Sequence, residues 1–438
     1  MLTMINRLRS TSQPKRARLR SVTGALLSFA LPLALPGLAA AVQELPNHIF
    51  SRNGASSTTV LVDKRTRSAY LVDLEKDTPK LRRSFDDLLF GENDGEKIHE
   101  GDKRTPEGVY RITNYIPKDK LAPIYGAGAF PINYPNTLDR IEGRNGSGIW
   151  LHGRDDNDPK KQVTRGCVAF NNNQIGELKA LLHKDTPVII TRETQFIPAT
   201  EYHQQREELF TLFDSFIEAW ENGEIDQLSE LIHPEFHSPG GIDREAWLAR
   251  KSQLNRLYPK KVIETDDVYA FKEDGKQVVF DFTQSYCADN LSARGKKKLF
   301  FKRDNGKLKL ITESYESLPG KSYTNEKVDH FIADWLSAWR NADIDRYLSH
   351  YGSKFRDGSG KNLAQWRDYK RTIFTDRPDQ QIQIDDLSIK ELHNNRYQIR
   401  FKQDYRSADY ADQGIKTLIL EGCPGDFQIV AERWRKLR

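Results

Sequence analysis

The second half of this chain contains an internal repeat, and no other feature of the sequence restricts its fold as much. When the sequence is compared with itself at an offset of 119 residues, similar residues coincide without a gap from about residue 200 to the end. The coinciding pairs include Trp220 and Trp339, Trp247 and Trp366, Glu313 and Glu432, and Tyr315 and Trp434. Two copies of one structural unit are therefore predicted, at residues 199–318 and 319–438.

Each copy begins with helix and ends with strands. Apolar residues recur at three- and four-residue steps over residues 209–220 and 328–339, which predicts an amphipathic helix at the start of each copy. In the first copy, strand-like runs follow at residues 278–286, 297–302 and 308–315. This order predicts an α+β unit. It resembles the cone-shaped nuclear-transport-factor-two-like fold, which hosts both enzymes and binding modules and therefore assigns no activity by itself.

The aromatic residues shared by the two copies fit either a ligand pocket or a core. Aromatic residues at helical spacing more commonly form a core, and we interpret these as core. His237 and Asp289 coincide with Arg356 and Ala408, so neither belongs to a repeated catalytic pair. Binding of glycan or an envelope protein, rather than catalysis, is predicted for both copies.

The N-terminus has the composition of an export signal. The first 41 residues carry six basic side chains and no acidic one, so the net charge of +5 for the whole sequence does not persist in the remainder. An apolar run at residues 25–38, shorter than the ~20 residues that span a bilayer, ends in three alanines. We predict a signal peptide at residues 1–41 and a mature protein in the periplasm or cell envelope, with no permanent membrane span. Nucleic-acid binding is not expected, because the basic surplus lies in the signal peptide.

The chain has three cysteines, Cys167, Cys287 and Cys423, which is an odd number. At least one thiol therefore has no partner within the chain, and in an oxidising compartment a retained thiol suggests catalysis. Cys287 and Cys423 lie at non-equivalent positions of the two copies. We expect two buried free thiols there rather than a disulfide.

The part before the repeats reads as one mainly β domain at residues 42–198. Strand-like runs at residues 58–62 and 68–74 predict a hairpin, and further runs occur at residues 109–113, 148–152 and 187–191. One short helix with an asparagine cap is predicted between Asn171 and His183. Residues 191–200, which include Pro198, are the expected linker.

The chemistry of this domain is concentrated around His152 and Cys167. A thiol is a nucleophile only as thiolate, and an imidazole beside it can take its proton and later return it to a leaving amine. Gly166 lets the chain turn tightly before Cys167 and direct backbone N–H groups at an oxyanion. A lone cysteine is more often a small buried hydrophobe, but a histidine and a cysteine flanked by glycines favour catalysis.

A metal site is the weaker alternative. Cys167 has no second cysteine nearby, and His99, His152 and His183 do not have ligand spacing. We predict neither a metal nor a cofactor.

Two segments resemble the L,D-transpeptidase (YkuD-type) catalytic domain family. They are His152-Gly153 with Thr164-Arg165-Gly166-Cys167 and Asn171, and an upstream landmark at residues 101–110. The resemblance covers about residues 55–192 and implies a β-sandwich with the cysteine at the end of a groove. It also implies a substrate, the peptide stems of peptidoglycan. The cysteine of such enzymes attacks the carbonyl of the third stem residue, usually meso-diaminopimelate, and expels D-alanine. An amine then gives transpeptidation, and water gives L,D-carboxypeptidation.

The resemblance also implies roles for individual residues. Cys167 would be the nucleophile, His152 the base, and the Gly153 carbonyl the group that orients the imidazole. The backbone amides of Gly166 and Cys167 would form the oxyanion hole. The expected substrate-binding residues are Thr164, Arg165, Tyr134 and Asn171.

Two positions depart from the cross-linking members of that family. Ala169 stands where they commonly have arginine, and Arg165 stands where they often have histidine or serine. The Gly-Cys-Val-Ala sequence, the segment 133–136 and the transport-factor-like repeats resemble the cell-shape branch, which includes L,D-carboxypeptidases that trim tetrapeptides to tripeptides. Transfer and hydrolysis both stay open.

Other readings carry less support. Residues 126–130 are glycine-rich but lack the lysine of a phosphate loop, so they are interpreted as a groove strand or turn. A non-catalytic, wall-binding envelope protein is disfavoured by the intact His152 and Cys167. A papain-like peptidase is disfavoured because there the cysteine precedes the histidine.

Overall fold

The structure is a computed structural model that describes residues 43–155, 157–158, 160, 162–273, 275–289, 291–377 and 379–437. The predicted signal peptide at residues 1–41 lies outside the described residues. Within the described part of the chain, no helix is both long and apolar enough to cross a membrane.

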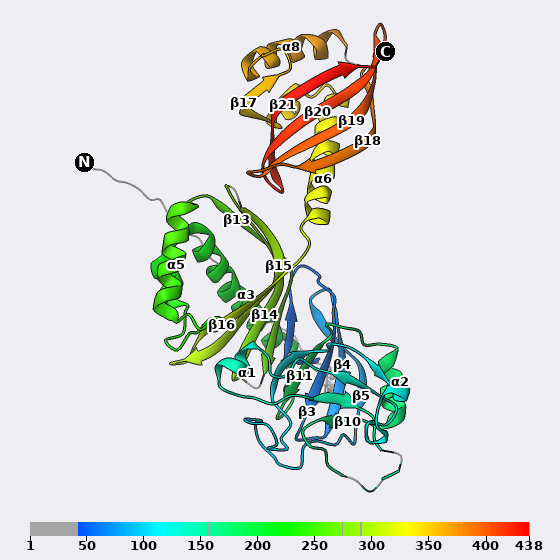
Figure 1. Ribbon diagram of the computed structural model, residues 1–438, viewed down its shortest axis with the longest axis vertical. Helices are drawn as coiled ribbons and strands as arrows, with labels where there is room; N and C mark the ends of the chain where they lie inside the picture. Colours follow the sequence, from blue (N-terminus) through cyan, green and yellow to red (C-terminus); the bar gives the residue numbers. More distant parts are fainter. Residues whose placement is uncertain are drawn as a thin grey trace, which may run out of the picture. The chain divides into compact units, whose positions relative to one another are not determined.

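The first part of the chain is a β-sandwich, as predicted (Figure 1). A five-stranded sheet has the order β5-β4-β3-β11-β6, and a four-stranded sheet has the order β10-β9-β8-β7. The strands of the first sheet are β3 (Thr58–Asp63), β4 (Ser68–Glu75), β5 (Thr78–Phe85), β6 (Gly108–Arg111) and β11 (Pro187–Thr191). Those of the second are β7 (Ile116–Pro117), β8 (Gly128–Pro131), β9 (Trp150–His152) and β10 (Val168–Ala169). The predicted hairpin is the antiparallel pair β3–β4.

Helix is scarce in the sandwich, as expected from the sequence. The helical segments of the sandwich are two short 3-10 helices, η1 (Lys118–Lys120) and η2 (Pro123–Tyr125), and two α-helices, α1 (Thr137–Ile141) and α2 (Asn172–Lys179). Asn171 is the N-cap residue of α2, as predicted. Its backbone N–H donates to the side-chain oxygen of Gln174, which is one of the two bonds of a capping box. The glycine-rich residues 126–130 form a turn that leads into β8.

Alternation along the strands explains why the five-stranded sheet is buried on both faces. Val60 and Val62 of β3 pack into one core with Leu151 and Val168 of the other sheet. Leu61, between the two valines, packs into a second core on the opposite face. Successive side chains of a strand point to opposite faces, so an almost continuous apolar run identifies a strand covered on both sides.

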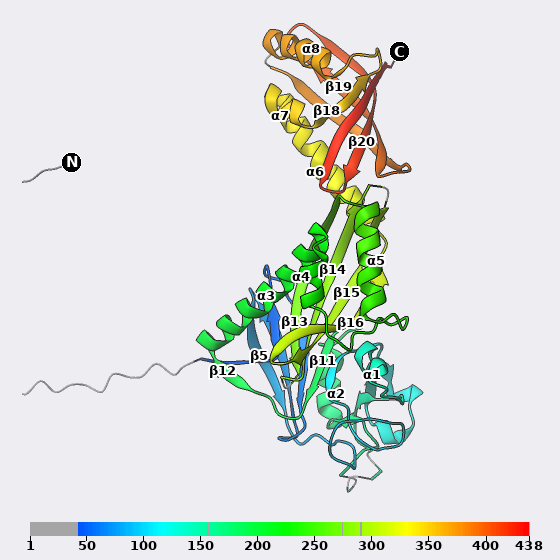
Figure 2. The same cartoon turned by 90° about the vertical axis from the view of Figure 1, so that its left-hand side faces the viewer.

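Both repeats fold as α+β cones, as predicted, with helices on one face of a curved sheet (Figures 1 and 2). The first cone consists of α3 (Ala199–Asn222), α4 (Ile225–Glu230), α5 (Arg244–Leu257), β13 (Lys261–Glu273), β14 (Gln277–Ala288), β15 (Leu291–Asp304) and β16 (Lys307–Ser317). The second consists of α6 (Lys321–Arg340), α7 (Ile344–Ser349), β17 (Tyr351–Asp357), α8 (Leu363–Asp376), β18 (Gln381–Glu391), β19 (Arg396–Arg406), β20 (Ala411–Cys423) and β21 (Asp426–Lys436).

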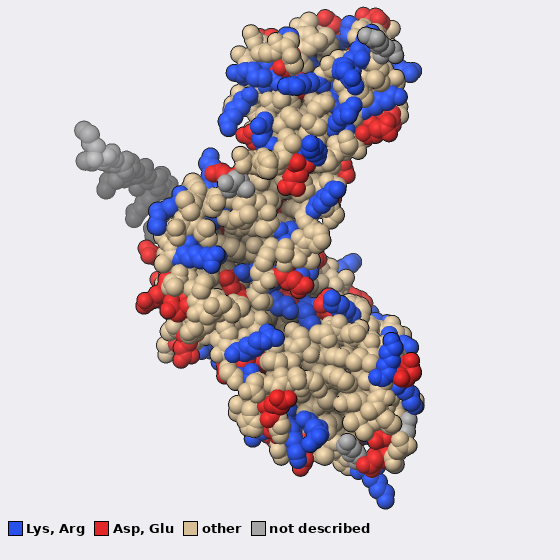
Figure 3. All heavy atoms as spheres, in the orientation of Figure 1, with Lys and Arg blue, Asp and Glu red and all other residues tan. Residues whose placement is uncertain are grey.

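The outer faces of the two cone sheets differ in chemistry. In the first cone, Val279 and Phe300 pack against Leu61 and Ile189 of the sandwich, in one apolar cluster. Arg111 of the sandwich adds a bond to Asp281 at the edge of this cluster, with Nη2 2.6 Å from the carboxylate. The second cone has Gln398, Ile419 and Arg400 in place of Val279, Phe300 and Asp281, and Lys and Arg side chains spread over its strands (Figure 3). The first cone is therefore packed on the sandwich through its sheet, whereas the second exposes a polar face.

The segment before the sandwich contributes to the first cone, which the sequence did not predict. Strand β2 (Ile49–Ser51) pairs with β13 and becomes the fifth strand of the cone sheet. The expected linker is also more ordered than predicted, because β12 (Phe196–Pro198) pairs with β1 (Glu44–Pro46). Helix α3 begins directly after it, at Ala199.

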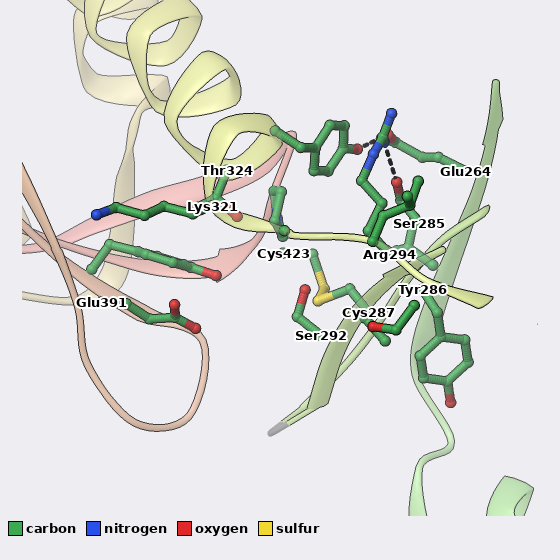
Figure 4. Close-up of a pocket in the computed structure, with 18 residues that line it drawn as sticks. Glu264, Ser285, Tyr286, Cys287, Ser292, Arg294, Lys321, Thr324, Glu391 and Cys423 are labelled. Atoms are coloured by element: carbon green, nitrogen blue, oxygen red, sulfur yellow. Dashed lines mark hydrogen bonds between the residues drawn. A yellow bond between two sulfur atoms is a disulfide. The ribbon is translucent and has the colours of Figure 1, made fainter. Parts of the chain in front are cut away.

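The expectation of two free thiols in the repeats was wrong. Cys287, at the end of β14, forms a disulfide with Cys423, at the end of β20, with Cα atoms 5.8 Å apart (Figure 4). The repeat register placed them at non-equivalent positions, but a bridge between two domains requires proximity and not equivalence. The bond joins the two cones covalently and leaves Cys167 as the free cysteine of the described chain.

Candidate active site and cone pockets

The candidate catalytic side chains lie on one face of the four-stranded sheet. Strands β9 and β10 are parallel, with Val168 opposite Leu151 and Ala169 opposite His152. Leu151 and Val168 point into the core. Because side chains alternate, His152, Ala169 and the preceding Cys167 belong to the opposite face.

His152 is oriented by its neighbour. Its Nδ1 lies 2.5 Å from the carbonyl oxygen of Gly153, which is the contact that the sequence predicted. A carbonyl oxygen can only accept a hydrogen bond, so Nδ1 carries a proton and donates it to this bond. The ring also packs edge-on against Tyr125, with ring centroids 5.1 Å apart. This aromatic contact restricts the rotation of the imidazole.

The thiol of Cys167 bonds a backbone carbonyl. Its Sγ lies 3.4 Å from the carbonyl oxygen of Gly148, to which the S–H donates. Burial raises the pKa of the Cys167 thiol above its usual value, while a backbone bond from Trp150 and the charge of Lys97 act in the opposite direction. The sequence suggested a thiolate–imidazolium pair; the raised pKa instead favours a neutral thiol that is deprotonated only when it attacks.

The turn before Cys167 corrects one prediction about the oxyanion hole. The backbone N–H of Gly166 donates to the hydroxyl of Thr164 at 3.1 Å, and that hydroxyl donates to the carbonyl of Cys167 at 2.7 Å. Thr164 therefore holds the turn, and the amide of Gly166 is already occupied. The backbone N–H of Cys167, by contrast, has no acceptor among the described residues.

The segment at residues 101–110, the second of the two that resemble the family, packs against this turn. Gly166 has φ of +127°, and a β-carbon there would lie 2.8 Å from the carbonyl oxygen of Arg104. Asp102 holds the landmark loop by accepting from the amides of Ile98, His99 and Arg104 and from the ammonium of Lys97, 2.7 Å away. The two motifs that are separate in sequence are thus in contact in the fold.

A cavity of about 100 Å³ opens at Cys167 and His152. Thr164 and Arg165, both expected near the substrate, also line it, with the exposed apolar side chains of Ile124 and Val163 at its edge. Arg154 is a lining residue that the sequence analysis missed. Its guanidinium pairs with Asp87 at 3.0 Å.

Two expected substrate-binding residues have structural positions instead. Tyr134 is buried in the sandwich core, and its hydroxyl donates to the carbonyl of Asn145. Asn171 caps α2 and does not line the cavity. The neighbouring Asn172 holds the loops beside His152, because its side chain accepts from Ala127 N–H and donates to the carbonyl of Arg154. Only the fold distinguishes these adjacent asparagines.

Each cone contains the same group of polar and aromatic residues, most of them buried, which we call the cone box. The members coincide at the repeat offset and are Trp220, Trp247, Lys251, Gln284, Lys297 and Glu313 in the first cone, and Trp339, Trp366, Lys370, Gln403, Lys416 and Glu432 in the second. All six members in the second cone line a cavity of about 600 Å³. The tryptophans are buried, as the core interpretation predicted, but they also form a pocket wall.

The charges of the two boxes are arranged alike. Lys297 pairs with Glu313, and Lys416 with Glu432, each at 2.5 Å. The second lysine of each box lies over tryptophan rings. The ammonium of Lys251 is 3.9 Å from the Trp220 centroid, and that of Lys370 is 4.2 Å from the Trp339 centroid. Burial lowers the pKa of both lysines to about 7.

The family comparison agrees with the geometry of the sandwich. The family model for the L,D-transpeptidase catalytic domain, YkuD, matches residues 57–190. The chain carries a YkuD-type L,D-transpeptidase domain. A second family model, for the Cds6 C-terminal NTF2-like domain, matches residues 208–314 and again residues 327–433. The L,D-transpeptidase domain is therefore followed by two NTF2-like domains, which supports a function in peptidoglycan metabolism.

Two solved structures resemble this chain over most of their own length. Bd1075 of Bdellovibrio bacteriovorus has 26% sequence identity and a TM-score of 0.57, and the match covers 63% of this chain and 99% of that chain. A mutant of the helical cell shape determining protein Pgp2 from Campylobacter jejuni has 25% identity and a TM-score of 0.53, with 61% of this chain and 93% of that chain covered. Nearly all of each relative thus corresponds to less than two thirds of this chain. A search of the curated proteins gave no match.

Proposed function

We propose that this protein is an exported cysteine acyl-enzyme that cleaves the bond between diaminopimelate and D-alanine in the tetrapeptide stems of peptidoglycan. The observation that carries the proposal is the shared cavity of Cys167 and His152, with Nδ1 of His152 bonded to the carbonyl of Gly153. The disulfide Cys287–Cys423 is compatible with the oxidising periplasm.

The reaction follows from these positions. Nε2 of His152 takes the thiol proton as Sγ of Cys167 bonds to the carbonyl carbon of diaminopimelate, and the N–H of Cys167 donates to the oxyanion. The C–N bond to D-alanine then breaks, and the imidazolium returns the proton to the leaving amine. Water or an amine next attacks the thioester and releases Cys167.

We propose water as the acceptor, which makes the protein an L,D-carboxypeptidase. Ala169 lies directly opposite His152 in the β9–β10 pairing, where cross-linking members of the family commonly have arginine. No cationic side chain therefore stands at this position to hold the carboxylates of a second stem. Arg165, exposed at the edge of the cavity, is the residue we propose for the D-alanine carboxylate of the donor stem.

The cones are proposed to bind the wall. A cone box with both lysines protonated has two ammonium groups and one carboxylate, and so one positive charge in excess. A stem peptide presents carboxylates, and the sugar rings to which it is attached can stack on tryptophan faces. The cavity of the second cone has the size of a small-ligand site.

The catalytic proposal is tested by incubating the protein with disaccharide-tetrapeptide and weighing the products. A disaccharide-tripeptide and free D-alanine are expected, and a cross-linked dimer would show transfer instead. Cys167→Ser and His152→Ala should each lower turnover by at least about a thousandfold. Full activity in either variant would refute the assignment. Asn173→Ala, on the exposed side of α2, is the matched control and should act as the parent does.

A further inference from the structure

The two cones have diverged where their surroundings differ and have stayed the same inside the cone box. On the outer sheet face, Asp281 corresponds to Arg400 and Val279 to Gln398. By contrast, all six members of the cone box are identical in the two copies. Packing alone does not demand this, because a hydrophobic core tolerates many substitutions of similar volume.

The retained lysines are unfavourable for folding. Lys370 is 5% exposed, and among the described residues it has no carboxylate within ion-pair distance. Burying an ammonium group with only aromatic faces as partners costs stability that a methionine at the same place would not. Two copies that both keep such a lysine indicate a ligand that requires the charge.

A glutamine in each box also lacks a partner. Gln284 and Gln403 are 5% and 3% exposed, and their Oε1 atoms accept no hydrogen bond from the described residues. Gln403 lies on the wall of the cavity, beside Lys370 and Lys416. Buried polar atoms are normally bonded, so an unpaired acceptor on a cavity wall suits an N–H or O–H donor of a ligand. The same feature in the first cone points to the same ligand chemistry there.

We propose that the second cone is a second wall-binding site equivalent to the first, so that one molecule of this protein holds two peptidoglycan stems at once. The inference rests on the proposed binding function of the cones, and what it adds is that each molecule has two such wall-binding sites. Nearly the full length of Bd1075 and of Pgp2 corresponds to less than two thirds of this chain, which leaves those relatives no room for the catalytic domain and both cones.

The disulfide makes the two sites act together. Cys287 and Cys423 lie at a pocket between the cones, where Arg294 bonds Ser285 (Figure 4). When two binding modules are joined by a short connection, the second binding event becomes intramolecular, and avidity exceeds single-site affinity by about 10² to 10⁴. A sacculus offers many stems at short spacing, so the gain applies to the polymer and not to a soluble fragment.

The first experiment counts the sites. The oxidised full chain with Cys167→Ala, which prevents turnover, is titrated with disaccharide-tetrapeptide in a calorimeter. Three sites per molecule are expected, namely the catalytic cavity and one in each cone, and two sites in each of the variants Lys251→Met and Lys370→Met. Methionine keeps the length of the side chain, so both variants should fold. Lys260→Met and Lys390→Met, at exposed positions of the two cones, are the matched controls and should keep three sites.

The second experiment measures avidity on purified sacculi. Either methionine variant should bind sacculi at least about tenfold more weakly than the parent, although each still has one intact cone site. Two sites in the parent, unaffected by Lys370→Met, would overturn the inference and leave wall binding by the first cone intact. A single site, unaffected by either methionine substitution, would overturn wall binding by both cones. Three sites without a loss of sacculus affinity in the variants would overturn the bivalent action.

Discussion

At the scale of single residues, the proposed catalytic pair is a thiol with a raised pKa and a histidine ring oriented by a backbone carbonyl. The carbonyl of Gly148 accepts the S–H of Cys167, and burial raises the pKa of this thiol. The carbonyl of Gly153 fixes the tautomer of His152. In the proposed reaction, the thiol is therefore deprotonated as Sγ bonds to the carbonyl carbon of the substrate. A resting thiol is also less prone to oxidation than a thiolate.

This arrangement predicts slow alkylation at neutral pH. The rate at which iodoacetamide modifies Cys167 in the folded protein should increase with pH up to a pKa above that of an ordinary cysteine, because burial raises the pKa of the thiol. The measurement is the mass of the modified protein at a series of pH values. A plateau already at pH 6 would show a preformed thiolate and contradict the structure. Cys167→Ser is the control and should stay unlabelled while Cys287–Cys423 is oxidised.

Sequence reasoning succeeded at residues whose role follows from type and order. His152 and Cys167 line one cavity and the Gly153 carbonyl bonds the His152 ring, so their placement agrees with the prediction, and their catalytic roles stay predictions. It failed for Tyr134, because the burial of an aromatic ring depends on the sheet that covers it. It also failed for the amide of Gly166, whose acceptor Thr164 is visible only once the turn is folded.

At the scale of elements, the cone box depends on helix and strand positions that meet only in three dimensions. Trp366 and Lys370 lie one turn apart on α8, and Lys416 and Glu432 lie on the adjacent strands β20 and β21. The repeat alignment exposed the tryptophans and glutamates. It did not expose the lysines as a site, because most lysines are solvated and their burial cannot be read from sequence.

The box lysines predict a pH dependence of binding and of stability with opposite signs. Lys251 and Lys370 have pKa values of about 7 in the folded protein, against about 10.5 when unfolded. Affinity for disaccharide-tetrapeptide should fall roughly tenfold between pH 6 and pH 8, because the neutral amines no longer attract a carboxylate. The free energy of unfolding should instead gain a contribution as pH rises from 7 to 10.5, where the unfolded chain binds more protons.

The variant Lys370→Met separates these two effects. It should raise the melting temperature of the second cone most strongly below pH 7, and the advantage should shrink as the pH approaches 10.5. Calorimetric scans at pH 6, 8 and 10 measure this. Lys390→Met, on the exposed face, should change neither the melting temperature nor its pH dependence. An equal gain at all pH values would mean that Lys370 is not buried as an ammonium group.

At the scale of the whole molecule, the first cone and the catalytic sandwich share a core, whereas the second cone has its own. Residues of both sheets, such as Leu61 and Phe300, belong to one apolar cluster, and Asp281 joins the domains through Arg111 while it also pairs with Lys298 of its own cone. The buried residues of the second cone form a separate cluster. Sequence could not reveal this difference in advance, since the repeat register treats the two cones as equal.

This arrangement predicts that the sandwich and the first cone unfold together. Asp281→Arg introduces the residue that the second cone carries at the same position, Arg400, and sets it against Arg111 and Lys298. Asp281 is buried, so losing its pairing should cost about 3–5 kcal/mol and lower the melting temperature of the catalytic domain and the first cone in one transition. The transition of the second cone should stay in place. The reciprocal change Arg400→Asp, on an exposed face, should leave both transitions unchanged, and a shift of the second cone with Asp281→Arg would contradict the separation of the two cores.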